Sequence, residues 1–368
     1  MADKAWSGNV GEWGEIYAAC ALLGAGQLSI AERPKPYQLL DLQRPEKQGS
    51  ASYVVDGGSV TPSSIGTKIP RSQFADAAMQ IRAAIQNRAT GTRAFTIPNL
   101  LQAQLKQLGF TKISAGSAVN ADLHLEVLSP NELERITLKG YSIKTEAGSA
   151  PTLYNMSSGR HLHYSITADA TALKNLNQEL SKGGRGRQQA FIDFSESHPV
   201  IVPGTPDFPQ CFSSEKVISD LRGLDGDAPM LIAYAVLEYY FYQSRKCSDA
   251  TGAVAVKDPL GGLKLASYQR KYAQIWREFS RGIGGRNYEG SAVNQGGILR
   301  VKADMSIEAV PVAGEDGSAL LSSTVFDAPD FGRWLEDMGL KGLTVNGATR
   351  ATLILPWQVR WVRGKSTA

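Results

Sequence analysis

Two stretches with the period of a β-strand lie next to each other near the middle of the chain. Residues 122–128, DLHLEVL, alternate between polar and apolar side chains, and residues 134–145, ERITLKGYSIKT, alternate again after a turn at Ser129 and Pro130. Side chains of a strand point to opposite faces in turn, so this period predicts an antiparallel pair with one apolar and one polar face. Gly140 interrupts the second stretch, and we expect a β-bulge there.

The polar face of this predicted pair carries an acid and a lysine. Asp122 lies on the first strand, and Ser142 and Lys144 share one face of the second strand because side chains repeat every two residues. An acid that can hold a divalent cation, with a lysine nearby, is the minimum set for metal-assisted hydrolysis of a phosphodiester. A half-exposed sheet also carries polar residues on its solvent face, so the pattern alone leaves a purely structural role open.

The first helix is predicted over residues 9–23. Asn9 and Glu12 form a capping-box pattern at its start, and Gly24 is expected to end it. Glu15 lies three residues after Glu12, so both carboxylates can project to the same side. Helix capping accounts for Glu12 as well as a functional role does, whereas no local structure accounts for Glu15.

Composition restricts the class of protein. The chain has 368 residues with 42% hydrophobic and 20% charged side chains, which is typical of a soluble globular protein with one large domain or two domains. No apolar run is long enough to cross a bilayer, and the first residues lack the apolar region of a signal peptide, so we expect a cytoplasmic protein. Three widely spaced cysteines fit neither a disulfide framework nor a zinc site.

The net charge of +4 is mild, so contact with nucleic acid must depend on local basic segments. The glycine-rich segment SKGGRGR contributes Lys182, Arg185 and Arg187. A predicted amphipathic helix over residues 265–281 combines aromatic side chains with several basic ones, namely Arg270, Lys271, Arg277 and Arg281. Both segments could contact DNA phosphates, although a solvated loop and a solvated helix face explain them equally well.

Four segments, taken together, resemble the HpaII-type family of type II restriction endonucleases. They occur in the order of that family and span nearly the whole chain. The two more specific ones are NVGEWGEIYAACALLGAGQL at the amino-terminal end and GYSIKTEAGSAPTLYNMSSGRHLHYSI in the centre, which has a G-x-S-I-K core followed by a T-L-x-N stretch. The two looser ones are DAPMLIAYAVLEYY and YEGSAVNQGGILRVKADMSIEAV.

This resemblance implies a nuclease of the PD-(D/E)XK kind, with an α/β fold in which a central mixed sheet is flanked by helices. It implies a nuclease core over residues 1–200, with the catalytic strands within 120–147. A C-terminal α+β extension over residues 210–368 would serve DNA recognition or dimerisation. The proline-rich composition of residues 199–209 separately predicts a boundary between the two parts.

The resemblance also implies roles for site residues. Asp122 would hold the metal and Lys144 would be the catalytic lysine, but Ser142 occupies the position where this nuclease class usually has an acid. Four glutamates could therefore supply the second carboxylate: Glu15, Glu12, Glu126 and Glu146. Of these we favour Glu15 on the predicted first helix. Glu126 lies about 13 Å along the strand from Asp122, and Glu146 lies about 7 Å beyond Lys144.

Mg²⁺ is the implied cofactor, held by Asp122, Glu15 and the main-chain carbonyl of Ile143. The implied substrate is double-stranded DNA, cut to a 5′-phosphate and a 3′-hydroxyl at a short GC-rich palindrome similar to the CCGG of the family prototype. Polar residues that closely follow the lysine strand could reach this DNA: Asn155, Ser158, Arg160 and His161. A palindrome favours a homodimer, although monomers also cut such sites, and a DNA methyltransferase would be the functional counterpart.

Other functions fit parts of the pattern. A nuclease of the same fold could cut by DNA structure, as in repair, and a DNA-binding protein could have lost catalysis. An enzyme acting on small molecules is disfavoured, because the chain lacks a cofactor motif and has a basic, aromatic helix.

Overall fold

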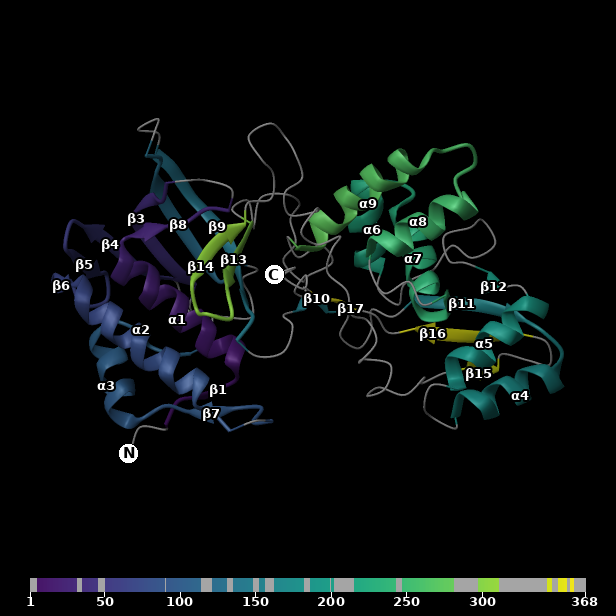
Figure 1. The fold of residues 1–368 in the computed structure, drawn as a ribbon, viewed down its shortest axis with the longest axis horizontal. Coiled ribbons are helices and arrows are strands. Elements are labelled where there is room, and N and C mark those ends of the chain that lie inside the picture. Colours follow the sequence, from purple (N-terminus) through teal and green to yellow (C-terminus); the bar gives the residue numbers. More distant parts are fainter. Residues whose placement is uncertain are drawn as a thin grey trace. The chain divides into compact units, whose positions relative to one another are not determined.

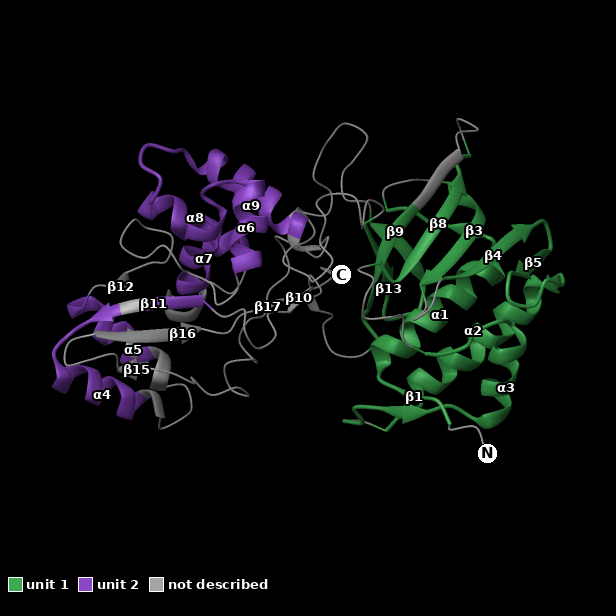
Figure 2. Ribbon diagram, turned by 180° about the vertical axis from the view of Figure 1, so that it is seen from behind, with its two compact units in different colours: residues 1–151, 285–321 green, residues 152–284, 322–368 purple. Residues whose placement is uncertain are grey.

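The computed structural model consists of two compact units, which are described separately (Figure 2). Unit 1 contains residues 1–151 and 285–321, and unit 2 contains residues 152–284 and 322–368. The structure describes residues 5–31, 35–45, 50–89, 91–113, 121–130, 135–147, 152–155, 162–181, 186–198, 200–201, 215–242, 247–280, 297–310, 343–345, 350–355 and 358–360.

A nine-stranded sheet forms the centre of unit 1, in the order β14-β13-β9-β8-β3-β4-β5-β6, with β2 beside β3. The β9–β13 pair is parallel and the other pairs are antiparallel, which confirms the predicted mixed sheet. The strands are β2 (Gln27–Leu28), β3 (Tyr37–Pro45), β4 (Ser50–Asp56), β5 (Ser59–Pro62), β6 (Ile69–Pro70), β8 (Leu123–Leu128), β9 (Arg135–Thr145), β13 (Gly297–Val301) and β14 (Ile307–Val310).

Helices α1 (Val10–Ala25) and α2 (Arg71–Gln86) cover one face of this sheet, and α3 (Asn99–Gln107) packs beside α2 (Figure 1). The short strands β1 (Ser7–Gly8) and β7 (Phe95–Thr96) pair with each other near α3. The predicted capping box begins α1, and Gly26, in the left-handed conformation, ends it two residues after the predicted glycine.

Burial along β8 follows the predicted alternation. Leu123, Leu125 and Val127 are buried in the core beneath α1 and α2, whereas the side chains between them are partly exposed on the other face. The bulge lies elsewhere than predicted: Leu125 pairs with Lys139 and Val127 with Ile136, so the extra residue of β9 falls between these two pairs. Gly140 itself pairs regularly.

Unit 2 is built around the apolar helix α7 (Ala228–Tyr242). The hydroxyls of Tyr164 and Tyr272 donate hydrogen bonds to its carbonyls at Ala233 and Leu231, at 2.8 and 2.6 Å. Its other helices are α4 (Ala170–Ser181), α5 (Gly186–Ser197), α6 (Glu215–Leu224), α8 (Cys247–Lys257) and α9 (Leu265–Ser280). Its strands are β11 (Leu162–Thr167), β12 (Val200–Ile201), β15 (Leu343–Val345) and β16 (Arg350–Leu355), in the order β12-β11-β16-β15, and the separate pair β10 (Thr152–Asn155) and β17 (Gln358–Arg360).

The compact units divide the chain differently from the predicted parts 1–200 and 210–368. The chain returns to unit 1 after residue 284, where β13 and β14 complete one end of the large sheet. Pairing between β9 and β13 joins residues more than 150 positions apart, and a boundary drawn from local composition does not show such pairing. Within the described ranges, no helix has the length and apolar character that a membrane crossing requires.

Candidate active site

Asp122 and Ser142 face each other at the point where β8 begins. Leu123 pairs with Tyr141, so the preceding residue of β8 lies opposite the following residue of β9. The Ser142 hydroxyl lies 3.3 Å from Oδ2 of Asp122, and the main-chain N–H of Ile143 donates to the same oxygen at 2.6 Å. The structure therefore brings together two of the predicted site residues and holds the acid through β9 itself.

Lys144 follows on the same face of β9, and its charge interacts with that of Asp122. Burial raises the pKa of the Asp122 carboxyl, whereas the charge of Lys144 and the hydrogen bonds from Ile143 and Ser142 act in the opposite direction. Burial lowers the pKa of the Lys144 ammonium, and the charges of Asp122 and Glu15 partly oppose this effect. The three predicted groups therefore form one electrostatically coupled cluster.

Close packing of α1 on β9 brings Glu15 to this cluster. A Cβ atom added at Gly14 would lie 2.1 Å from Oγ1 of Thr145, so only a glycine permits this approach. Glu15 follows Gly14 on α1, and Thr145 is the last residue of β9. The negative charge of Glu15 favours the charged form of Lys144 and so partly opposes the effect of burial on its pKa.

The other three glutamates have different surroundings. The Glu12 carboxylate accepts the main-chain N–H of Asn9 at 2.8 Å and so completes the helix cap. Glu126 lies opposite Asp41 of β3, two strand positions beyond His124. Glu146 is nearly buried and accepts a hydrogen bond from Nε of Arg300 at 2.5 Å. Sequence reasoning did not single out Arg300, because its pairing with β9 is a long-range feature.

The possible metal ligands around Asp122 are oxygen atoms. The N–H and C=O of one residue in an extended strand lie along the same edge, so the Ile143 carbonyl is on the edge of β9 that its N–H shares with Asp122. Carboxylates and carbonyls are the ligands that Mg²⁺ prefers. Over the described ranges, no three His, Cys, Asp or Glu side chains come close enough to hold a metal by themselves. A metal here would therefore need main-chain, water or substrate oxygens as well.

The predicted DNA-contacting residues of α9 have distinct surroundings. Arg270 is exposed, with Nη2 3.4 Å from the Ser267 hydroxyl. Nζ of Lys271 instead contacts Asp225 at 2.7 Å and Asp227 at 3.0 Å, so its charge is matched within unit 2.

Less is described of the remaining predicted contacts. Asn155, Arg187 and Arg277 lie on β10, α5 and α9, and their side chains are not among the described ones. The others lie outside the described residues: Ser158, Arg160, His161, Lys182, Arg185 and Arg281.

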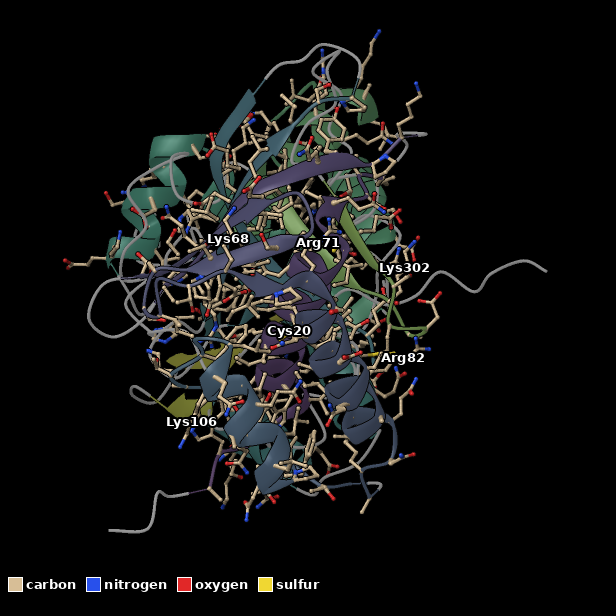
Figure 3. The ribbon with its side chains drawn as sticks, turned by 90° about the vertical axis from the view of Figure 1, so that its left-hand side faces the viewer. Cys20, Lys68, Arg71, Arg82, Lys106 and Lys302 are labelled. Atoms are coloured by element: carbon tan, nitrogen blue, oxygen red, sulfur yellow. The ribbon has the colours of Figure 1, made fainter. Side chains whose placement is uncertain are left out.

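Figure 3 labels several basic side chains of unit 1, among them Lys68, Arg71 and Lys302. Lys68 pairs with Asp56 at 2.6 Å, and Lys302 pairs with Glu308 at 3.1 Å. The Arg71 guanidinium donates to main-chain carbonyls at the end of α1. These contacts give the three cations structural partners within unit 1.

Two of the three cysteines are described. Cys20 on α1 and Cys247 on α8 are free, buried thiols, and burial raises the pKa of both, that of Cys247 to about 12. Cys211 lies outside the described residues.

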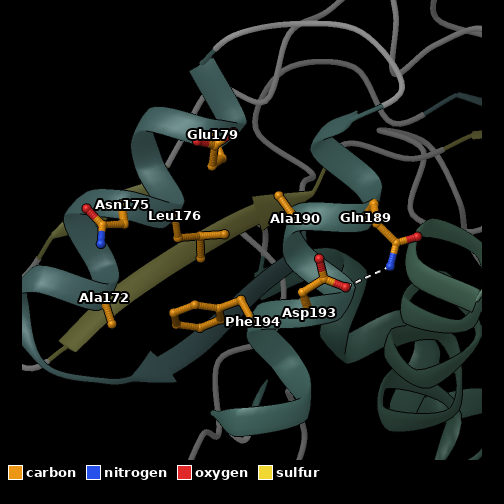
Figure 4. A pocket seen from close by; sticks show the side chains of 8 residues that line it. All are labelled: Ala172, Asn175, Leu176, Glu179, Gln189, Ala190, Asp193 and Phe194. Carbon is orange, nitrogen blue, oxygen red and sulfur yellow. Dashed lines mark hydrogen bonds between the residues drawn. The ribbon is translucent and has the colours of Figure 1, made fainter.

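A cavity of about 490 Å³ lies between α4 and α5 in unit 2 (Figure 4). The Asp193 carboxylate accepts a hydrogen bond from the Gln189 amide at 2.7 Å. Its described lining contains no basic side chain and consists of Ala172, Asn175, Leu176, Glu179, Gln189, Ala190, Asp193 and Phe194. This cavity therefore lacks the acid–lysine combination found in unit 1.

Comparison with known proteins assigns this chain to the restriction endonucleases. The chain belongs to the HpaII restriction endonuclease family, whose family model matches residues 9–309. The curated type II restriction enzyme HpaII of Haemophilus parainfluenzae is 29% identical over 344 residues, which cover 89% of this chain and 92% of that enzyme. No solved structure matches the chain. The predicted family and the predicted enzyme class, a type II restriction endonuclease, are thus confirmed.

Proposed function

We propose that this enzyme hydrolyses phosphodiester bonds of double-stranded DNA in a Mg²⁺-dependent, sequence-specific reaction that leaves a 5′-phosphate and a 3′-hydroxyl. The observation that carries this proposal is the pairing of Asp122 and Ser142 beside Lys144 on one sheet face, with the charge of Glu15 on α1 also acting on Lys144, in a member of a restriction endonuclease family. We assign the core of unit 1 to the PD-(D/E)XK nuclease fold. The acid-bearing β8 beside the lysine-bearing β9 supports this assignment.

Asp122, Glu15 and the carbonyl of Ile143 would hold the metal ion. Bound Mg²⁺ supplies Lewis-acid stabilisation of the negative charge that develops on the phosphate. Ser142 holds the Asp122 carboxylate in place through its hydroxyl, which gives a physical role to the serine at the usual acid position. The second carboxylate would then come from α1.

Lys144 would act next to the attacking water. Its ammonium group favours the hydroxide form of that water and stabilises the extra charge of the pentavalent transition state. Burial strengthens both effects, because a charge acts over a greater range where water is excluded. Burial lowers the pKa of this lysine, and the charges of Asp122 and Glu15 favour its protonated form and partly oppose that effect.

The recognition site would be a short GC-rich palindrome similar to CCGG. Guanine-rich sites are read through the major groove, chiefly by Arg and Lys side chains. We assign this reading to unit 2, where Arg270 is exposed on α9, and we expect a homodimer on the palindrome. A DNA methyltransferase that modifies the same site would protect the host genome.

The direct test is digestion of a plasmid with and without Mg²⁺. The expected result is a set of discrete fragments whose ends map to one short sequence, carry 5′-phosphates, and disappear when the metal is chelated. A smear or single nicks would indicate cutting by DNA structure. Retarded but intact DNA would indicate a binding protein without catalysis, and either result would reject the proposal.

Replacement of Glu15 by Gln should lower the single-turnover cleavage rate by roughly 100-fold, because the metal loses an anionic ligand. If weaker metal binding is the cause, the loss of rate should be smaller at high Mg²⁺ concentration. The matched control is Glu12→Gln, one helical turn earlier, whose side chain can still accept the capping hydrogen bond from Asn9. Equal losses in the two variants would show that Glu15 has no special place in the site.

A further inference from the structure

Arg300 of β13 lies beside the catalytic lysine. β13 is the neighbour of β9 on the side away from β8 (Figure 1), and in this parallel pair Arg300 is the register partner of Lys144. Residues directly opposite each other on neighbouring strands project from the same face of a sheet, with main chains about 4.8 Å apart. The face that carries Asp122 and Ser142 therefore continues across β9 to Arg300.

The contacts of Arg300 show the same orientation. Its Nε donates to Glu146, which lies two residues after Lys144 and so shares that face of the chain. Glu146 is only 6% exposed, whereas the Arg300 side chain is 26% exposed. A buried carboxylate thus contacts the Nε edge of the guanidinium while part of the Arg300 side chain is exposed.

A guanidinium carries five N–H donors in a rigid plane, and the Glu146 contact uses the one on Nε. Nη1 of Arg300 also forms an ion pair with the Glu308 carboxylate at 3.8 Å, and Glu308 contacts Lys302 more closely, at 3.1 Å. The geometry of the forked Nη groups matches phosphate oxygens, and an arginine remains protonated at any working pH.

Resting on the proposed nuclease function, we propose that Arg300 is a further catalytic residue, whose Nη groups donate hydrogen bonds to a non-bridging oxygen of the phosphodiester being cut. Glu146 is its positioning residue: it fixes the guanidinium plane through Nε and is thereby withdrawn from metal binding. The scissile phosphate would then lie between Asp122 on one side of Lys144 and Arg300 on the other.

The test is single-turnover cleavage of a duplex that contains the recognition site, with DNA affinity measured separately without Mg²⁺. We expect Arg300→Ala to lower the cleavage rate by about 100-fold while DNA affinity changes by less than about 3-fold, because the contact strengthens in the transition state. Added guanidinium ions should restore part of the rate, whereas the same concentration of Na⁺ should not. A merely structural arginine would not give this rescue.

Two further variants separate the roles. Glu146→Gln should reduce the rate by less than Arg300→Ala and should not respond to guanidinium, because Arg300 is still present. Glu308→Gln, which alters the more distant neighbour of the same arginine, should cut at nearly the parent rate. If Arg300→Ala unfolds because Glu146 is left as an unpaired buried charge, the double variant R300A/E146Q removes both charges and allows the same rescue experiment.

The outcomes are distinct from those for the proposed function. A parent enzyme that cuts DNA together with an Arg300→Ala variant that cuts at the parent rate, or is slowed without guanidinium rescue, rejects the role of Arg300 alone. A parent enzyme that cuts no DNA in Mg²⁺ rejects the nuclease proposal and this inference with it.

Discussion

Replacement of Lys144 by alanine should lower the cleavage rate by roughly 1,000-fold or more while the protein still binds its DNA. The lysine ammonium is coupled to Asp122 and Glu15, and its loss removes the positive charge beside the reacting phosphate. DNA affinity should persist because most of the binding free energy of such proteins comes from many separate phosphate and base contacts. Single-turnover cleavage and a gel-shift titration at fixed salt measure the two quantities.

Lys139 offers a matched control on the same strand. It lies five residues earlier on β9, opposite Leu125, where β8 pairs with β9 away from the acid. Lys139→Ala removes the same charge from the same element and should leave the cleavage rate within a few-fold of the parent. If Lys144→Ala still cuts at the parent rate, the assignment of the active site to this sheet face is wrong.

Replacement of Asp122 by asparagine should have an effect of similar size. Asparagine keeps the shape of the side chain and can still accept the N–H of Ile143, but it removes the negative charge of the proposed metal ligand. We expect no cleavage at any Mg²⁺ concentration. Glu126→Gln is the matched control, because Glu126 is an acid on the same face of β8 that lies opposite Asp41.

The same substitution should change the ionisation of Lys144. Burial lowers the pKa of this ammonium, and the negative charge of Asp122 raises it, so removal of that charge should lower the pKa further. NMR titration of the lysine side-chain resonances in parent and Asp122→Asn protein would measure the shift. A Lys144 pKa that is unchanged or higher in the variant would show that the two groups are not coupled as the structure indicates.

Local sequence signals predicted much of unit 1. The capping box of Asn9 and Glu12 located the start of α1, and the two-residue period located β8 and β9 and separated their buried and polar faces. Such features depend on interactions between residues a few positions apart, which a single sequence contains in full. The bulge of β9 was misplaced because its position depends on the register with β8, and Gly140 was only a local hint.

The sequence left the second carboxylate of the site unassigned for the same reason. Ser142 at the usual acid position led to the prediction that a second acid comes from elsewhere, but four glutamates were compatible with the sequence. Glu12 caps its helix, Glu146 contacts Arg300, and Glu15 acts on Lys144. These assignments come from packing of a helix on a sheet and from pairing of distant strands.

The sequence by itself determined the family, the strand pair with its acid and lysine, and the helix that carries Glu15. Only the tertiary structure decided how the chain divides into units, that Lys271 is matched by Asp225 and Asp227, and that Arg300 lies beside Lys144. The physical reason is the sequence separation over which each interaction acts. Periodicity and capping act along a few residues, whereas a charged side chain acquires its partner only when segments far apart in the chain are brought together by the core.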